Sequence, residues 1–289
     1  MSDSPAAHDP RETRSPVKQA VEGLGALADL QLRQGVGLIR NIGGMAALFA
    51  DTIVWCFRGF FRPDVRLSRA ALTTQMLRVG VDSIGIVIIV EFFIGSILAL
   101  QLAPVLASYG QLDQVAVVIA IAIVRELGPL LTGIVLSGYA GASIAAELGA
   151  MVEAEEIKAL RAHALDPIRF LIVPRFLATA VMIVGLTVIA DIVGVLGGCL
   201  TSWVVLGVSP QVYVDITQTA LVAKDFITGL VKAGVFGMLI ATIACYQGLN
   251  VSGGAVGVGR ATTATVVQCI VAIIGMDAAF TAVFYAFGL

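Results

Sequence analysis

The chain has 289 residues, of which 58% are hydrophobic and 13% are charged. Soluble domains carry about 25% charged residues, so this composition excludes an ordinary soluble enzyme and predicts an all-α protein that crosses a membrane several times. The formal net charge of −2 says nothing about partners, and we expect no nucleic-acid partner.

The N-terminal part of the chain is polar and then amphipathic. Residues 1–18 are rich in polar side chains, Pro and Ser, which predicts a disordered tail. Across 20–62, apolar residues such as Ile42, Met45 and Phe49 recur at helical spacing among scattered arginines. This pattern predicts a helix that lies in the membrane interface rather than one that spans the membrane.

Five later segments are long enough to cross a bilayer as helices, which takes about 20 apolar residues. They cover about 80–107, 115–151, 170–206, 226–249 and 264–288. The second segment contains 125-RELGP-129, where proline disfavours helix. A tilted helix, or a short re-entrant piece followed by a full span, would both fit.

The distribution of Lys and Arg predicts the orientation of these spans. Ten of the 18 precede the first span, and four more lie between Lys158 and Arg175 after the second, whereas the loop 108–114 has none. By the positive-inside rule, we expect the N-terminus and the loop after the second span in the cytoplasm and the C-terminus outside.

Charged residues crowd into the stretch 153–165, between the second and third spans. Ile157, Leu160 and Ala164 fall on one helical face there, so a short cytoplasmic helix is predicted, with Asp166 capping the helix that follows. The stretch is either an ordinary solvated loop or a lever that docks into a soluble partner. Its candidate docking residues are Glu153, Glu155, Glu156, Lys158, Leu160 and Arg161.

The second span carries small residues at every fourth position, a spacing that lets helix backbones approach closely in lipid. This ridge packs either against another span of the same chain or at a dimer interface. Its members are Gly133, Ser137, Gly141, Ala145 and Gly149.

Ionisable residues within membrane spans are costly and by default indicate function. They are Glu91, Arg125, Glu126, Asp191, Lys232 and Asp277. The guanidinium of Arg125 suits the phosphate of a lipid headgroup, so we expect Glu91, Arg125 and Glu126 to border a substrate cavity. A structural charge pair between Arg125 and Glu91 is the alternative.

Other chemistry is poorly supported. The four cysteines are solitary and there are only two histidines, so we expect no metal site, no catalytic residue and no bound cofactor. The stretch 254-GAVGVGRA-261 has the glycine spacing of a phosphate-binding loop but lacks its Lys and Ser/Thr. We expect a flexible loop there and no ATP hydrolysis by this chain.

Several landmarks together resemble the MlaE (YrbE) family of ABC-transporter permeases. The resemblance covers about 40–289 and is densest from 125 to 176. Its landmarks are 125-RELGP-129, the run Gly138–Gly141, 146-AELG-149, Asp166-Pro167, Pro174-Arg175, 259-GRATTATVV-267 and Gly275-Met276-Asp277. Departures from the family pattern at Tyr139, at 154-AEE-156 and at Ala264 leave the carried lipid and the partner's identity open.

The resemblance implies that residues 19–289 form one permease domain of a homodimer in a bacterial inner membrane. Such a permease pairs with a cytoplasmic ABC ATPase, which uses the ATP, and with a periplasmic MCE-domain protein. Together they move phospholipids or related lipids between the inner and outer membranes. The short charged helix would be the coupling helix that contacts the ATPase.

Two other functions are considered. An ion-coupled secondary transporter could use Glu91, Glu126, Asp191 and Asp277, but no pair of matching broken halves is found. A membrane-embedded lipid enzyme would need clustered Asp or His, and the carboxylates here are dispersed.

Overall fold

A computed structural model describes residues 37, 39–59 and 69–287. Helices and turns, and no strands, occur among these residues, which confirms the all-α class. The predicted tail 1–18 lies outside the described residues. Contacts divide the chain into two units, residues 1–47 and residues 48–289.

The helix Ile39–Gly59 is the described part of the predicted interfacial segment. Among the described residues it is one of six helices that are long and apolar enough to span a membrane, and it is the least apolar of the six. Trp55 lies under the guanidinium of Arg169, and the ring of Phe49 meets that of Phe176 edge-on at 5.8 Å between centroids. Length and composition do not separate an interfacial from a spanning helix, so its interfacial placement stays a prediction.

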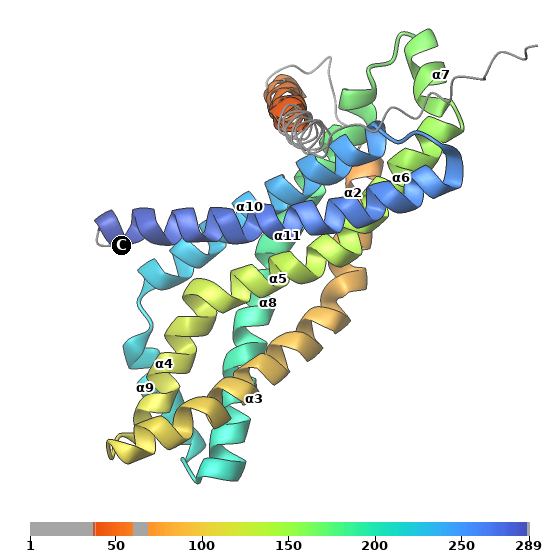
Figure 1. The fold of residues 1–289 in the computed structure, drawn as a ribbon. Helices are drawn as coiled ribbons and strands as arrows, with labels where there is room; N and C mark the ends of the chain where they lie inside the picture. The colour runs from red at the N-terminus through yellow and green to blue at the C-terminus, as the bar shows by residue number, and fades with distance from the viewer. Residues whose placement is uncertain (1–36, 38, 60–68, 288–289) are drawn as a thin grey trace, which may run out of the picture. The chain divides into compact units, whose positions relative to one another are not determined.

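The first four predicted spans lie within longer helices, and the fifth does so as far as Phe287, where the described residues end (Figure 1). The first comprises α2 (Arg69–Gly80), η2 (Val81–Ser83) and α3 (Ile84–Ser108). The second comprises η3 (Leu112–Gln114), α4 (Val115–Ala122), η4 (Ile123–Leu127), α5 (Gly128–Leu136), η5 (Ser137–Gly141) and α6 (Ala142–Glu153). The third comprises η6 (Ile168–Ile172) and α8 (Val173–Leu206), and the last two are α10 (Ala223–Leu249) and α11 (Gly254–Phe287).

The predicted break at 125-RELGP-129 is a π-helical turn inside a continuous helix. Segment η4 has this wider turn, and Pro129 sits in the first turn of α5, where a missing N–H is tolerated. The helix runs without interruption from Leu112 to Glu153. The structure therefore contains the continuous helix and not the re-entrant piece.

The last helix begins ten residues earlier than expected, so the prediction of a flexible loop at 254–261 was wrong. Gly253 and Gly254 adopt positive φ angles of 95° and 68° and make the turn. A Cβ at Gly257 would overlap the carbonyl oxygen of Ser252, so glycine permits the tight start of α11. The glycines are needed by the turn and its packing, although their low helix propensity resembles that of a loop.

A short helix in the loop after the third span was also not predicted. Helix α9 (Pro210–Ala220) begins where the hydroxyl of Ser209 accepts a hydrogen bond of 3.4 Å from the backbone N–H of Val212. Pro210 occupies its first turn, and the buried ring of Tyr213 anchors it.

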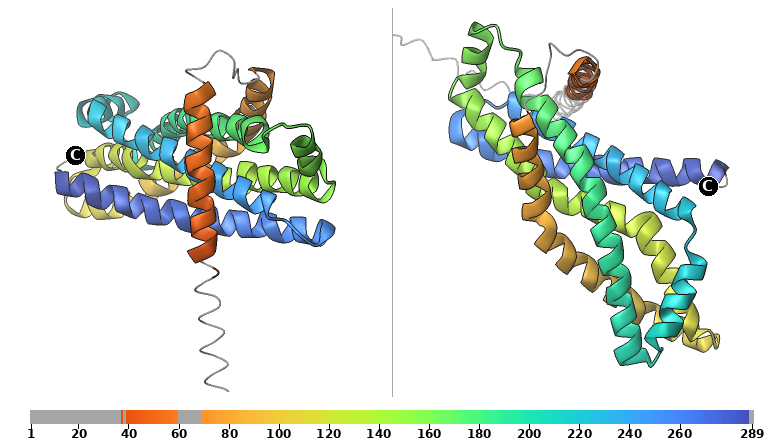
Figure 2. Two further views of the ribbon diagram at one scale, coloured as in Figure 1. Left: turned by 90° about the horizontal axis from the view of Figure 1, so that it is seen from above. Right: turned by 180° about the vertical axis from the view of Figure 1, so that it is seen from behind.

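Helix α8 is central in the second unit. It packs against α2, α3, α5 and α10, and Figure 2 shows α10 and α11 side by side, crossing the other long helices obliquely. Helices α7 (Glu156–Ala162) and α9 lie at opposite ends of this bundle (Figure 1). The bundle therefore has two chemically different ends, joined by the long spans.

The small-residue ridge of the second span packs against helices of the same chain. A Cβ at Gly141 would lie 3.4 Å from a methyl carbon of Ile240 on α10, and one at Gly149 would lie 2.8 Å from Val251. All five ridge positions are largely covered: Gly133, Ser137, Gly141, Ala145 and Gly149. Of the two alternatives for the ridge, the geometry matches packing within the chain.

Candidate functional site: a charged network between the second span, α10 and α11

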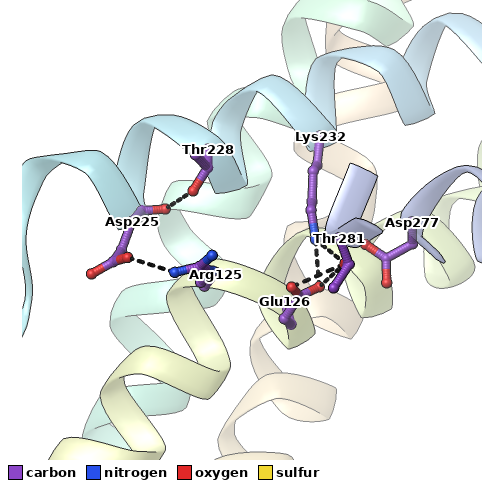
Figure 3. A network of polar contacts seen from close by, with 7 residues as sticks. All are labelled: Arg125, Glu126, Asp225, Thr228, Lys232, Asp277 and Thr281. Carbon is purple, nitrogen blue, oxygen red and sulfur yellow. Dashed lines mark hydrogen bonds and ion pairs between the residues drawn. The ribbon is translucent and has the colours of Figure 1, made fainter. Parts of the chain in front are cut away.

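Lys232 of α10 is the centre of a polar network inside the bundle (Figure 3). Its side chain is completely buried, and its ammonium forms an ion pair with Glu126 of η4. It forms a second ion pair with Asp277 of α11, with 3.0 Å between Nζ and Oδ1. A buried lysine is stable only when such anions compensate its lost hydration, so the network joins three helices.

Thr281 links the lysine to one of its carboxylates. Its hydroxyl accepts a hydrogen bond of 3.1 Å from Lys232 and donates one of 3.2 Å to Glu126. Asp277 and Thr281 are four residues apart on α11 and so lie on one helix face. The ring of Phe284, a turn further on, lies 5.9 Å from the ammonium and covers it.

The neighbouring arginine has a different partner. Arg125 donates to Asp225 of α10, with 3.4 Å between Nη1 and Oδ1. The other oxygen of Asp225 accepts from the backbone N–H of Val222 and so caps the start of α10. Adjacent helical residues point about 100° apart, which explains why Arg125 and Glu126 reach different sets of partners.

Exposure increases from the centre of the network towards its edge. The Lys232 side chain is 0% exposed and that of Asp277 is 15%, whereas those of Arg125 and Glu126 are 30% and 31%. The network contains two cationic and three anionic side chains. A cation and an anion on adjacent residues of η4 are thus accessible from outside, while the lysine is sealed behind them.

The sequence hypothesis placed three residues at this site, and the structure brings two of them together. Glu91 lies elsewhere, on α3, and neither of its carboxyl oxygens has a hydrogen-bond partner among the described residues. The alternative of a hydrogen-bonded pair between Arg125 and Glu91 is therefore not observed. The sequence analysis named Lys232 and Asp277 as intramembrane ionisable residues but did not place them at this site.

The sequence analysis did not name Asp225 or Thr281, which also belong to the network. Asp225 and Lys232 are seven residues apart and Asp277 and Thr281 four, so each pair shares a helix face. That spacing was a usable signal. Which faces meet could not be derived from it.

A charged hairpin lies at one end of the bundle, where α6 ends and α7 begins. Helix α7 covers only 156–162, which corrects the predicted 153–165, because Glu155 and Ala164 adopt left-handed φ angles of 62° and 58° on either side. Ile157 is buried and fixes the inner face, while the candidate docking residues except half-buried Leu160 are exposed. The described hairpin thus presents charges outward on a short, anchored helix.

Local interactions define this hairpin further. Lys158 donates a hydrogen bond of 2.6 Å to Glu155, and this bond lowers the pKa of that carboxyl group. The Asp166 carboxylate accepts from the backbone N–H of Ile168 at 2.9 Å, which confirms the predicted cap. Because the hydrogen bond from Lys158 lowers its pKa, Glu155 remains a carboxylate throughout the neutral range.

Three charged residues join the helices beneath the hairpin. Glu147 of α6 forms ion pairs with Arg78 of α2 and with Arg175 of α8, the latter at 3.0 Å. Arg175 is buried and also donates to the carbonyl of Leu171 at 2.9 Å. These ion pairs therefore connect α2, α6 and α8 at the end of the bundle where α7 lies.

An all-helical bundle of long apolar helices, with a charged hairpin at one end and an internal ionic network, defines a multi-pass membrane protein. The family model described as Permease MlaE matches residues 72–283. The chain belongs to this family of ABC-transporter permeases.

Relatives from three kinds of organism are similar over most of the chain. A probable ABC transporter permease protein of Rickettsia felis is 39% identical over 242 residues, which is 84% of this chain and 92% of the relative. A second relative is the intermembrane phospholipid transport system permease protein MlaE of Haemophilus influenzae. It is 31% identical, and the match covers 78% of this chain and 87% of the relative. The chloroplastic protein TRIGALACTOSYLDIACYLGLYCEROL 1 of Arabidopsis thaliana is 35% identical over 73% of this chain and 60% of its own.

Family membership decides between the functions considered above. The chain is an ABC-transporter permease subunit, a class that is typically non-catalytic and implies a partner ATPase. The permease class therefore replaces the other two functions, the ion-coupled transporter and the membrane-embedded lipid enzyme.

Proposed function

We propose that this permease moves phospholipids or related lipids between the inner and outer membranes of a bacterium. A separate cytoplasmic ATPase supplies the energy. The names of two relatives support a lipid substrate, because one refers to intermembrane phospholipid transport and the other to a glycerolipid.

The observation that carries this proposal is the partly exposed ionic network. A phospholipid headgroup has an anionic phosphate and often a cationic amine. Arg125 offers a guanidinium fork that matches phosphate oxygens, and the adjacent Glu126 offers a carboxylate, both about one-third exposed. Buried Lys232 adds a fixed positive charge behind Glu126. Glu91 is buried and belongs to a different contact, so we restrict the proposed headgroup site to Arg125 and Glu126.

The hairpin around α7 is the proposed docking site for the ATPase. Its exposed charges of both signs suit a soluble surface, and the ion pairs of Glu147 connect it to three helices. By the orientation expected from the Lys and Arg distribution, α7 is cytoplasmic and α9 is periplasmic. A periplasmic MCE-domain protein is the partner proposed for the α9 end.

A second copy of the chain is the partner proposed within the membrane. Most of the apolar surface of α11 is exposed, and an open groove of about 650 Å³ runs along its first half. In a membrane protein, either lipid or another helix covers such a surface. The groove is lined by Val256, Gly259, Arg260, Thr263, Ala264, Val267 and Gln268.

The test is to purify the tagged chain from its native membrane and to reconstitute what co-purifies into vesicles with labelled phospholipid. We expect an ATPase with a Walker motif and ATP-dependent phospholipid movement. Reversing Glu155 and Glu156 to Lys should abolish co-purification, because both are exposed on the hairpin. The matched control reverses exposed Asp113 and Asp215 near the opposite end and should leave the ATPase bound.

The same preparation tests the headgroup site. Arg125→Ala should reduce transport severalfold while the ATPase stays bound, whereas Arg69→Ala, at an exposed position at the start of α2, should not. Undiminished transport by Arg125→Ala at normal expression would remove Arg125 from the headgroup site. Transport without any ATPase would overturn the proposed function itself.

A further inference from the structure

Two acidic residues are sealed inside the contact between α3 and α8, apart from the ionic network. Glu91 of α3 is 1% exposed and Asp191 of α8 is 4% exposed. Both carboxyl oxygens of Glu91 and Oδ1 of Asp191 lack a hydrogen-bond partner among the described residues. Native proteins rarely leave three buried carboxyl oxygens unsatisfied, so a bound species at this position needs to be considered.

The helices approach closely here because glycines face backbone atoms. A Cβ at Gly95 of α3 would overlap the carbonyl oxygen of Gly194 on α8, and one at Gly197 would overlap that of Phe92. Side chains of both helices therefore face each other with little space between the backbones.

The same geometry brings the two acids to one level. The carbonyl oxygen of Glu91 would lie 3.5 Å from a Cβ at Gly194. Helical side chains lean towards the N-terminus, which directs the Glu91 carboxyl towards Asp191, about one turn before Gly194. On its other side, Asp191 touches Gly128 at the start of α5, where a Cβ would overlap Oδ1. The acids thus occupy a closed site between α3, α8 and α5.

Charged side chains of the surrounding elements do not donate to the three unsatisfied oxygens. Arg125 pairs with Asp225, Lys232 with Glu126 and Asp277, and Arg78 and Arg175 pair with Glu147. Helices α4 and α5 carry no charged residue. The other titratable or charged groups on elements packed against α3 or α8 are Arg69, Asp82, Asp113, Arg169, Cys199, Tyr213, Asp215, Lys224, Cys245 and Tyr246.

We propose that Glu91 and Asp191 form a proton-binding site, in which at least one of the two carboxyl groups is protonated at neutral pH. Two adjacent carboxylates without a cation would each lose hydration and would repel each other in an apolar surrounding. A proton neutralises one acid and provides a donor for an unsatisfied oxygen. The site is separate from the headgroup network and does not depend on which lipid the chain carries.

Proton occupancy would be linked to the packing of α3 against α8. Loss of the proton would place uncompensated charge in a contact where backbones touch, and the helices would have to separate to admit water. Because α8 follows directly from the α7 hairpin through η6, the proton stabilises the contact between the first span and the helix that continues from the proposed ATPase dock.

Infrared spectroscopy tests this directly, because the carbonyl stretch of a protonated carboxylic acid is separate from carboxylate and amide bands. The full chain in lipid nanodiscs at neutral pH is compared with the double variant Glu91→Gln/Asp191→Asn. We expect the wild-type-minus-variant spectrum to contain a protonated-acid band that shifts in D₂O. The control Asp215→Asn, at an exposed site on α9, should give carboxylate bands only.

A difference spectrum with carboxylate bands alone would show both acids ionised and would overturn the proposal. If the double variant does not fold, the wild-type protein alone still decides. The wild-type protein is prepared with and without ¹³C in the side-chain carboxyls of Asp and Glu. At neutral pH both spectra must contain a protonated-acid band, and the label must shift its position. Its absence overturns the proposal without any variant.

Discussion

The two groups of buried acids in this permease satisfy the same physical requirement in opposite ways. Glu126 and Asp277 face the ammonium of Lys232, whereas Glu91 and Asp191 leave three carboxyl oxygens without a hydrogen-bond partner among the described residues. In the first group the negative charges are compensated by a cation and by partial access to solvent. In the second, neither compensation exists among the described residues, and a proton is the proposed neutraliser.

This difference shows why a carboxyl group in a membrane span does not by itself indicate a transport site. Of the paired acids, Glu126 is about one-third exposed and adjacent to Arg125, so it can meet a substrate. The unpaired acids are buried where glycines bring the helix backbones close together, so a lipid headgroup does not reach them. The charged network is therefore suited to binding a headgroup, and the acid pair is suited to holding two helices together.

The largest effect is expected from removing the lysine. Lys232→Met leaves Glu126 and Asp277 without their cation, and breaking a buried ion pair costs about 3–5 kcal/mol. We expect a much lower melting temperature in detergent and loss of ATP-dependent transport. Lys224→Met changes an exposed lysine on the same helix and should cost less than about 1 kcal/mol. Equal melting of the two variants would contradict an ionised network around Lys232.

An intermediate effect is expected where the acid pair's helices touch. Gly95→Ala adds a methyl group that overlaps the carbonyl of Gly194, and overpacking of this kind costs about 1–3 kcal/mol. Gly85→Ala is the matched control on the same helix, because nothing lies within 4 Å of the added carbon. Thermal unfolding of both variants measures the contact. Similar melting temperatures would mean that α3 and α8 do not touch through their backbones at Gly95.

Local patterns in the sequence predicted the helical elements better than their ends. Apolar length located the long spans, and Asp166-Pro167 located a cap that the structure contains. The start of α11 was missed because the glycines of 254–261 have low helix propensity, yet one of them is required by close packing against Ser252. Helix α9 was missed although Ser209-Pro210 is a usual helix start.

The site was less predictable than the helices because its interactions connect distant parts of the chain. Glu126 and Lys232 are 106 positions apart, and Glu126 and Thr281 are 155 apart. Periodicity shows which residues share a face of one helix but does not show which faces meet. The ionisable residues could therefore be identified individually, while their division into a paired and an unpaired group required the structure.

The smallest effect is expected from Glu91→Gln, and its comparison with Glu126→Gln distinguishes the two groups directly. Glu126→Gln removes a charged partner of Lys232 and should cost about 1.5–3 kcal/mol, the range for hydrogen bonds to charged groups. Glu91→Gln replaces a carboxyl that has no such partner, and an amide resembles a protonated acid in shape and charge. We expect less than about 1 kcal/mol for it, comparable to one net hydrogen bond. Melting temperatures of the two variants, measured side by side in the same detergent, show whether Glu91 behaves as a protonated or as an ionised acid. A loss at Glu91 as large as that at Glu126 would mean that Glu91 is ionised and that a cation compensates it.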